Sequence, residues 1–293
     1  PPLPVTDSVL VATDVPESAY AAWNSGTAYA VGNRVHLTST HKVYEALTAH
    51  TNKPPATSPA DWVEVGPTNR WALFDTSNST QTAQASAFYY ELTPTGAFNA
   101  ATLLNLTGGL EVRWRVTHPT LGTLLDDTDS LASLPVQAGW WEWFYGERMA
   151  PSIAQRTDLP GIIGSTLRVD VTGTTALAAG VLLFGQTKEI GMLVQQGARV
   201  GIQDYSRKET NEWGDVVLVQ RAYAKRASFE VPVAAALVDE AARFLTLYRA
   251  TPCLFIGGGR YEATTVYGFL KDWDVSITYA THSVLTLQLE GLT

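Results

Sequence analysis

Residues 110–118, LEVRWRVTH, alternate apolar and polar side chains without a break. The apolar residues are Leu110, Val112, Trp114 and Val116. A period of two places them on one side of an extended chain, as in a strand that buries one face of an antiparallel sheet. The stretch at 166–173 repeats the alternation, and residues 176–185 are almost entirely apolar. Because turn residues separate these short runs, the pattern predicts a β-sandwich over residues 67–194.

One stretch near the C-terminus carries a helical period instead. In VPVAAALVDEAARFLTLYRATP, residues 231–252, apolar side chains recur at intervals of three and four. This spacing predicts an amphipathic helix with Pro232 in its first turn. Its apolar stripe consists of Leu237, Ala241, Phe244, Leu245 and Tyr248. The flanking sequences are typical of strands, so residues 195–293 are predicted to form an α+β unit in which one helix covers a sheet.

Residues 19–66 contain short strand-like runs between glycines and the pair Pro54-Pro55, which predicts a small all-β module. A module of about 45 residues buries little apolar area and depends on large aromatic side chains to stay folded. Residues 1–18 are rich in proline and are predicted to form an extended N-terminal arm. The predicted fold class is therefore mainly β, with a small module, a β-sandwich and a C-terminal α+β unit.

The charge of the chain narrows its range of partners. The formal net charge is −8, and none of the predicted segments is basic. Attraction to nucleic-acid phosphates or to an anionic membrane surface is therefore not expected. No apolar run approaches the roughly 20 residues that a membrane span needs, so no membrane insertion is predicted. The sequence opens on Pro1-Pro2 without a leader pattern, and Cys253 is its only cysteine. We therefore expect a protein made in a reducing cytoplasm, with no internal disulfide.

The sequence carries few signatures of catalysis. It contains neither G-x-S-x-G nor H-E-x-x-H, and we predict no enzyme activity and no cofactor. Three histidines lie in the small module, His36, His41 and His50, and their spacing fits no metal-ligand pattern, so we predict no metal site. A polysaccharide-degrading enzyme stays an alternative, because it needs only a suitably spaced carboxylate pair and the chain has 28 acidic residues.

Asp126, Asp127 and Asp129 lie close together in LLDDTDS, residues 124–130. Three carboxylates at this spacing offer oxygen ligands to calcium, but the glycine and the terminal glutamate of an EF-hand loop are missing. We expect a solvated acidic turn, with a cation site as the alternative.

The densest aromatic stretch is GWWEWFYGERM, residues 139–149. In an extended chain, alternation places Trp141, Trp143 and Tyr145 on one face and further rings on the other. A strand with aromatic residues on both faces is typical of a buried strand or a subunit interface. We predict an interface here, with a ligand platform as the alternative.

Residues 23–62 carry the pattern W-x-x-G-x-x-Y-x-x-G-x-x-V, followed by Y-E-A, P-P and a closing W. The positions are Trp23, Gly26, Tyr29, Gly32, Val35, Tyr44, Pro54, Pro55 and Trp62. This pattern resembles the short chitin- and cellulose-binding modules of bacterial chitinases, cellulases and phage tail proteins. The resemblance implies a sugar-binding face, for which Tyr29, Tyr44 and Trp62 are the candidate stacking rings. The aromatic pair that follows Y-x-A in those modules is absent here, so we expect the aromatic residues chiefly to hold the fold together.

Further stretches resemble a tail protein of long-tailed bacteriophages. They are TNRWALFD at 68–75, GIQDYSRKETNEWGD at 201–215, VQRAYAKRASFEV at 219–231, YRATPCLFIGGG…VYGFLKDWDVS at 248–276 and LEGLT at 289–293. The resemblance implies a structural virion protein of a tail tip or baseplate, in the style of distal tail proteins, assembled in the host bacterial cytoplasm. Its implied partners are other phage tail proteins, further copies in a homo-oligomeric ring (trimer or hexamer) and host-surface polysaccharide. The alternative is a glycan-binding adhesion protein that acts outside a virion.

Overall fold

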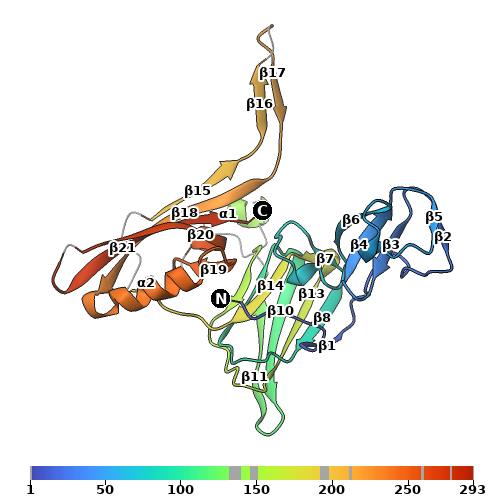
Figure 1. Cartoon of the computed structure of the whole chain (residues 1–293). Helices are drawn as coiled ribbons and strands as arrows, with labels where there is room; N and C mark the ends of the chain where they lie inside the picture. The colour runs from blue at the N-terminus through green and yellow to red at the C-terminus, as the bar shows by residue number, and fades with distance from the viewer. Residues whose placement is uncertain are drawn as a thin grey trace. The chain divides into compact units, whose positions relative to one another are not determined.

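The computed structural model describes residues 2–131, 140–145, 151–191, 198–210, 213–258, 261–277 and 279–292. The chain is mainly β, as predicted, and its strands belong to several separate sheets (Figure 1). It divides into two compact units. The sandwich unit consists of Val5–Ala97 and Ala101–Leu182, and the C-terminal unit consists of Pro1–Pro4, Phe98–Ala100 and Leu183–Thr293.

Two sheets give the middle of the chain its sandwich-like fold. The larger sheet has the order β1-β8-β13-β10-β11, with β7 also paired to β13. These strands are β1 (Leu10–Thr13), β7 (Thr82–Ala83), β8 (Ala87–Leu92), β10 (Thr107–His118), β11 (Gly122–Ser130) and β13 (Thr166–Ala179). The smaller sheet has the order β12-β9-β14, made of β12 (Ala154–Arg156), β9 (Ala100–Leu104) and β14 (Val181–Gly185).

The strands predicted at 110–118 and 166–173 are confirmed as the antiparallel pair β10 and β13 in the larger sheet. Val112, Trp114 and Val116 are fully buried, as their alternation predicts. Leu110 is half exposed instead, because the register of β10 against β13 shifts between Gly109 and Glu111. A bulge of this kind ends the strict alternation of faces.

The N-terminal segment differs from the predicted extended arm. Within residues 1–18, Leu10–Thr13 forms β1, which pairs with β8 at the edge of the larger sheet. The Thr13 hydroxyl donates to the carbonyl of Tyr89 at 2.7 Å, and Val15 is completely buried. Part of this segment therefore belongs to the sandwich itself.

The small module is all-β, as predicted. A three-stranded sheet has the order β3-β4-β6, and β2 and β5 form a separate two-stranded antiparallel sheet. The elements are β2 (Ala28–Tyr29), β3 (Arg34–Leu37), β4 (Lys42–Ala46), β5 (His50–Thr51), the 3₁₀ turn η1 (Pro55–Thr57) and β6 (Trp62–Pro67). A second 3₁₀ turn, η2 (Ala72–Phe74), follows the module.

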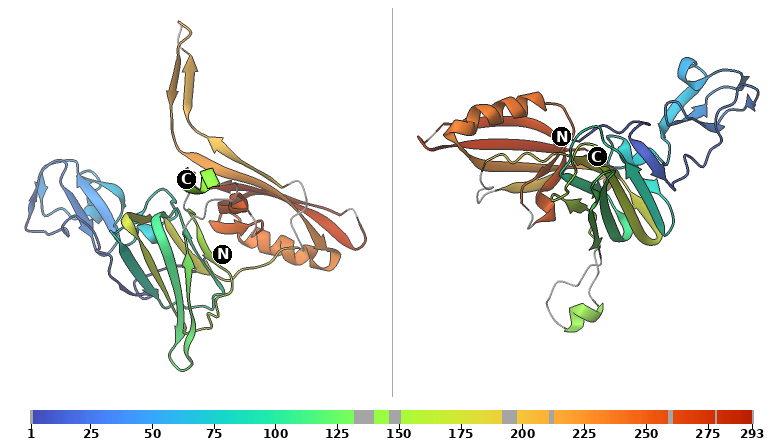
Figure 2. Two further views of the ribbon diagram at one scale, coloured as in Figure 1. Left: turned by 180° about the vertical axis from the view of Figure 1, so that it is seen from behind. Right: turned by 90° about the horizontal axis from the view of Figure 1, so that it is seen from below.

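The C-terminal unit contains a five-stranded antiparallel sheet of order β15-β18-β21-β20-β19. Its strands are β15 (Arg199–Asp204), β18 (Tyr223–Ala234), β19 (Cys253–Ile256), β20 (Thr265–Ser276) and β21 (His282–Gly291). Two 3₁₀ turns, η3 (Ala235–Leu237) and η4 (Glu262–Thr264), and helix α2 (Val238–Leu247) complete it. Helix α2 runs along one face of the sheet, where Ala241 and Leu245 join its core (Figure 2). A hairpin of β16 (Arg207–Thr210) and β17 (Val216–Val219) extends beyond the sheet (Figure 1).

The predicted helix is shorter than 231–252. Residues Val231–Ala234 complete β18, and the α-helix begins only at Val238. Pro232 therefore lies in a strand, opposite Val284 of β21. Within the described ranges, β18 has a neighbouring strand on one side only at this point, since β15 pairs with it between Tyr223 and Ser228. A strand tolerates proline where one side is unpaired.

Candidate functional site

The aromatic residues of the small module form its core. Trp62 packs edge-on against Tyr29, with ring centroids 5.2 Å apart, and against His50, at 4.7 Å. The indole N–H of Trp62 donates to the carbonyl of Lys53 at 2.9 Å, and the Tyr29 hydroxyl accepts from the backbone N–H of Asn24 at 2.8 Å. Each polar end of these two rings is thus satisfied inside the module.

The three candidate sugar-stacking residues are all buried. Tyr29 is 7% exposed, Tyr44 8% and Trp62 3%. Stacking on a pyranose needs an open ring face, which these side chains do not present. The module therefore uses them for packing. Packing of the module core therefore accounts for the many aromatic residues in this short segment.

The acidic cluster at 124–130 lies in strand β11, and not in a solvated turn. Its carboxylates face arginines. Asp126 pairs with Arg113 at 2.6 Å, and Arg156 contacts both Asp127 and Asp129. Within the described ranges, no group of three or more His, Cys, Asp or Glu side chains is arranged to hold a metal ion.

Arg156 links the two sheets of the sandwich. It lies on β12, and its guanidinium donates to both carboxylate oxygens of Asp129 on β11, at 2.9 and 2.8 Å. The other donor to Asp129 is the indole N–H of the fully buried Trp114, at 2.8 Å. Hydrogen bonding to Arg156 lowers the pKa of the Asp127 carboxyl, and hydrogen bonding to Arg113 lowers that of Asp126. The cluster therefore has a structural role.

Replacing Arg156 by methionine is expected to destabilise the sandwich by about 2 kcal/mol at pH 7, because Asp129 loses its cation beside a buried ring. Arg156 also lowers the pKa of the Asp127 carboxyl. A carboxyl whose pKa is lowered by folding stabilises the folded state fully above its unfolded pKa of about 3.9 and loses that effect as the pH falls further. The difference between wild type and variant should therefore narrow below pH 4 in urea unfolding curves.

A matched control is Lys42→Met, which removes an exposed ion pair with Glu64. We expect a change within about 0.5 kcal/mol. A difference for Arg156→Met that stays constant from pH 7 to pH 2.5 would show that lost packing, and not charge, causes the destabilisation.

The aromatic stretch predicted as a strand is instead a short helix, α1 (Trp140–Tyr145). Rings four residues apart contact one another on this helix. The ring centroids of Trp141 and Tyr145 lie 4.4 Å apart, and those of the stacked Trp140 and Phe144 lie 6.1 Å apart. All four are exposed, Trp140 by 85%. Trp143 belongs to the same helix, but its side chain lies outside the described residues. The expected grouping of Trp141, Trp143 and Tyr145 on one strand face is therefore wrong.

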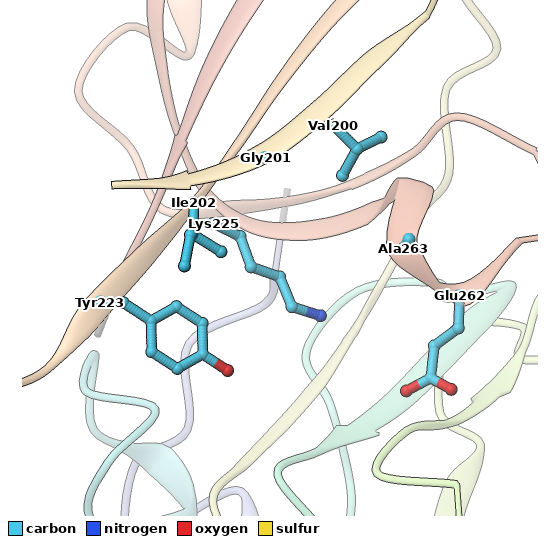
Figure 3. Close-up of a pocket in the computed structure, with 7 residues that line it drawn as sticks. All are labelled: Val200, Gly201, Ile202, Tyr223, Lys225, Glu262 and Ala263. Atoms are coloured by element: carbon cyan, nitrogen blue, oxygen red, sulfur yellow. The ribbon is translucent and has the colours of Figure 1, made fainter. Parts of the chain in front are cut away.

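A hollow of about 460 Å³ opens beside the edge strand of the C-terminal sheet. Its lining residues are Val200, Gly201, Ile202, Tyr223, Lys225, Glu262 and Ala263 (Figure 3). Val200 and Ile202 of β15 are 42% and 62% exposed. Among the described lining residues, polar side-chain ends come from Tyr223, Lys225 and Glu262. The site thus offers apolar contact area next to an open strand edge.

The exposure of Val200 and Ile202 could not be predicted from the sequence, because apolar residues in a strand-like run are normally assigned to a core. No helix in the described part of the chain is long and apolar enough to span a membrane.

No protein-family model matches the chain, and no curated protein is similar to it.

Proposed function

We propose that the chain is a structural subunit of a bacteriophage tail tip or baseplate that assembles into a homo-oligomeric ring. One observation carries the assembly. The five-stranded sheet ends in β15 on one side and β19 on the other, and neither has a second neighbouring strand among the described residues. Joining unlike edges of successive copies is a heterologous contact, which closes into a ring when the rotation fits.

The β15 edge has the character of an interface. Strand edges of monomeric proteins are usually protected by charges, prolines or bulges. β15 carries charges only at its ends, Arg199 and Asp204, and exposes Val200 and Ile202 between them. Burying the area of these two side chains that is still exposed contributes roughly 1.5–3 kcal/mol to association.

The phage setting comes from the resemblance of five stretches to tail proteins, together with the assembly surface. In this setting the partners are other tail proteins and further copies, and the location is the virion. Contact with host-surface polysaccharide remains part of the proposal, but through groups other than Tyr29, Tyr44 and Trp62, since these rings are buried.

The ring is tested with the double variant Val200→Lys/Ile202→Lys in the full chain. By sedimentation, we expect the wild type to have the mass of a trimeric or hexameric ring or of a whole multiple of it, and the variant to associate at least tenfold more weakly through this edge. The control is Val31→Lys, which makes the same substitution at an exposed valine of the small module. This variant should keep the wild-type mass. A wild type of single-chain mass, or an unaffected double variant, would contradict the ring.

The virion location is tested separately with a gold-labelled antibody on phage particles. We expect gold at the tail end. Unlabelled particles, with an antibody that binds the native protein, would favour the second candidate, a glycan-binding adhesion protein outside a virion. The exposed rings of α1 favour that candidate, since Trp141 is 74% and Tyr145 71% exposed. Trp141→Ala should then weaken retention on host polysaccharide.

A further inference from the structure

The hairpin of β16 and β17 is a two-stranded ribbon whose apolar side chains are exposed. Its register pairs Lys208 with Leu218 and Glu209 with Val217. Val216, Val217, Leu218 and Val219 are 60%, 53%, 70% and 44% exposed. A two-stranded ribbon with no covered face is marginally stable in water, whereas three or more strands support one another. The ribbon therefore has the composition of a segment that gains a further strand.

The two edges of the ribbon differ in character. β16 reads RKET, and its charges are neutralised locally, since Lys208 pairs with Asp204 at 2.7 Å and Arg207 pairs with Glu209. Charged side chains on an edge strand oppose pairing with another chain. β17 reads VVLV and has neither charge nor proline, which favours pairing. The open edge is thus that of β17.

The sequence around β17 is complementary to itself. Asp215 precedes the apolar run, and Arg221 follows it, so each lies three residues from Leu218. In an antiparallel pair of two copies with Leu218 on the two-fold axis, Asp215 lies opposite Arg221 of the second copy, and the reverse pair forms at the other end. Val217 then lies opposite Val219 of the second copy. Cross-strand apolar and opposite-charge pairs of this kind each stabilise a sheet by roughly 0.2–1 kcal/mol.

The ribbon extends far enough for this register. The backbone N–H of Arg221 donates to the Ser206 hydroxyl at 3.1 Å, and the N–H of Tyr205 donates to the carbonyl of Ala222 at 3.3 Å. The chain is thus held against its own hairpin partner at Arg221, and the opposite edge faces outward. A shift of one residue places Asp215 opposite Gln220 and removes both charge pairs, so charge fixes the register.

We propose that two copies of this chain pair antiparallel along β17, with Leu218 on the two-fold axis, to form a four-stranded ribbon β16-β17-β17-β16. The contact is isologous, and it uses a different strand edge from the β15 contact of the proposed ring. It therefore goes beyond the proposed function and does not depend on it. Where both contacts form, two rings are joined face to face.

The first test is a symmetric disulfide in the full chain. Leu218→Cys brings two thiols together on the two-fold axis, and under mild oxidation most of the chain should run at twice the monomer mass on a non-reducing gel. The matched control is Lys208→Cys, directly opposite Leu218 within the hairpin but on the charged strand. The native Cys253 is buried. Equal cross-linking of the two variants, or none of either, would overturn the proposal.

The second test exchanges the charges. Asp215→Arg and Arg221→Asp each place like charges opposite one another twice, and each should weaken pairing at least tenfold by sedimentation. The double variant restores both opposite-charge pairs and should recover the wild-type association. Double-variant association no better than the single variants would contradict the register. These variants leave β15 unchanged, and Val200→Lys/Ile202→Lys leaves β17 unchanged. The two contacts are therefore separated when one set of variants loses the ring but keeps β17 pairing, and the other loses β17 pairing but keeps the ring.

Discussion

Trp62→Ala is expected to unfold the small module while leaving the sandwich folded. Trp62 is 3% exposed and contacts Tyr29 and His50, so its truncation leaves a cavity at the centre of the module. Removing a buried tryptophan costs about 3–5 kcal/mol. A unit of this size has a total stability of only about 2–7 kcal/mol, so the loss is comparable to the whole.

Limited proteolysis with mass spectrometry measures this directly. We expect rapid cleavage within residues 19–66 of the variant, with fragments from the sandwich protected as in the wild type. Val31→Ala is the control, because Val31 is 67% exposed and its truncation leaves no cavity. A Trp62→Ala protein with wild-type protection throughout the module would show that its core does not depend on this ring.

Gly268→Ala is expected to disrupt the C-terminal sheet at the contact between β20 and β21. A β-carbon at Gly268 would lie 2.0 Å from the carbonyl oxygen of Glu290 and 2.6 Å from the α-carbon of Gly291. Both are backbone atoms of the paired strand, so relief requires the strands to separate. Overpacking costs typically 1–3 kcal/mol and occasionally more, and a backbone clash of this size belongs at the upper end.

Denaturant unfolding, followed by the intrinsic tryptophan fluorescence to which Trp273 of the same strand contributes, measures the effect. Gly201→Ala is the matched control in the same sheet. A β-carbon there meets nothing within 4 Å, so the variant should match the wild type or gain a few tenths of a kcal/mol. If Gly268→Ala unfolds at the wild-type midpoint, β20 and β21 are farther apart than this structure places them.

Local sequence patterns correctly predicted the elements that pack against the same neighbours along their whole length. The strict alternation of residues 110–118 identified a strand with one buried face, and the structure confirms β10. The same reasoning extended the helix too far toward the N-terminus, since Val231 and Val233 satisfy a period of two as well as a helical stripe. Val231 and Val233 form a strand because they pair with Leu285 and Ser283 of β21. A local sequence pattern cannot predict pairing with residues so distant in the sequence.

The expected acidic turn and aromatic strand differ from the structure for similar reasons. Asp127 and Asp129 looked like cation ligands only because Arg156, on another strand, could not be placed beside them. The aromatic alternation at 140–145 suited a strand equally well, but i,i+4 ring contacts favour a helix, and no strand among the described residues pairs with this segment.

The order of strands in the larger sheet also governs how the chain folds as it is made. β8 lies between β1 and β13, and β13 ends at Ala179. At ribosomal speeds of about 5–20 residues per second, the roughly 90 residues between β8 and the end of β13 take about 5–20 seconds to emerge. The small module, whose strands pair only among themselves, completes its sheet well before then. Until β13 has emerged, β8 lacks this neighbouring strand and its apolar face stays exposed. The sandwich is therefore the part of the nascent chain that most needs protection from aggregation.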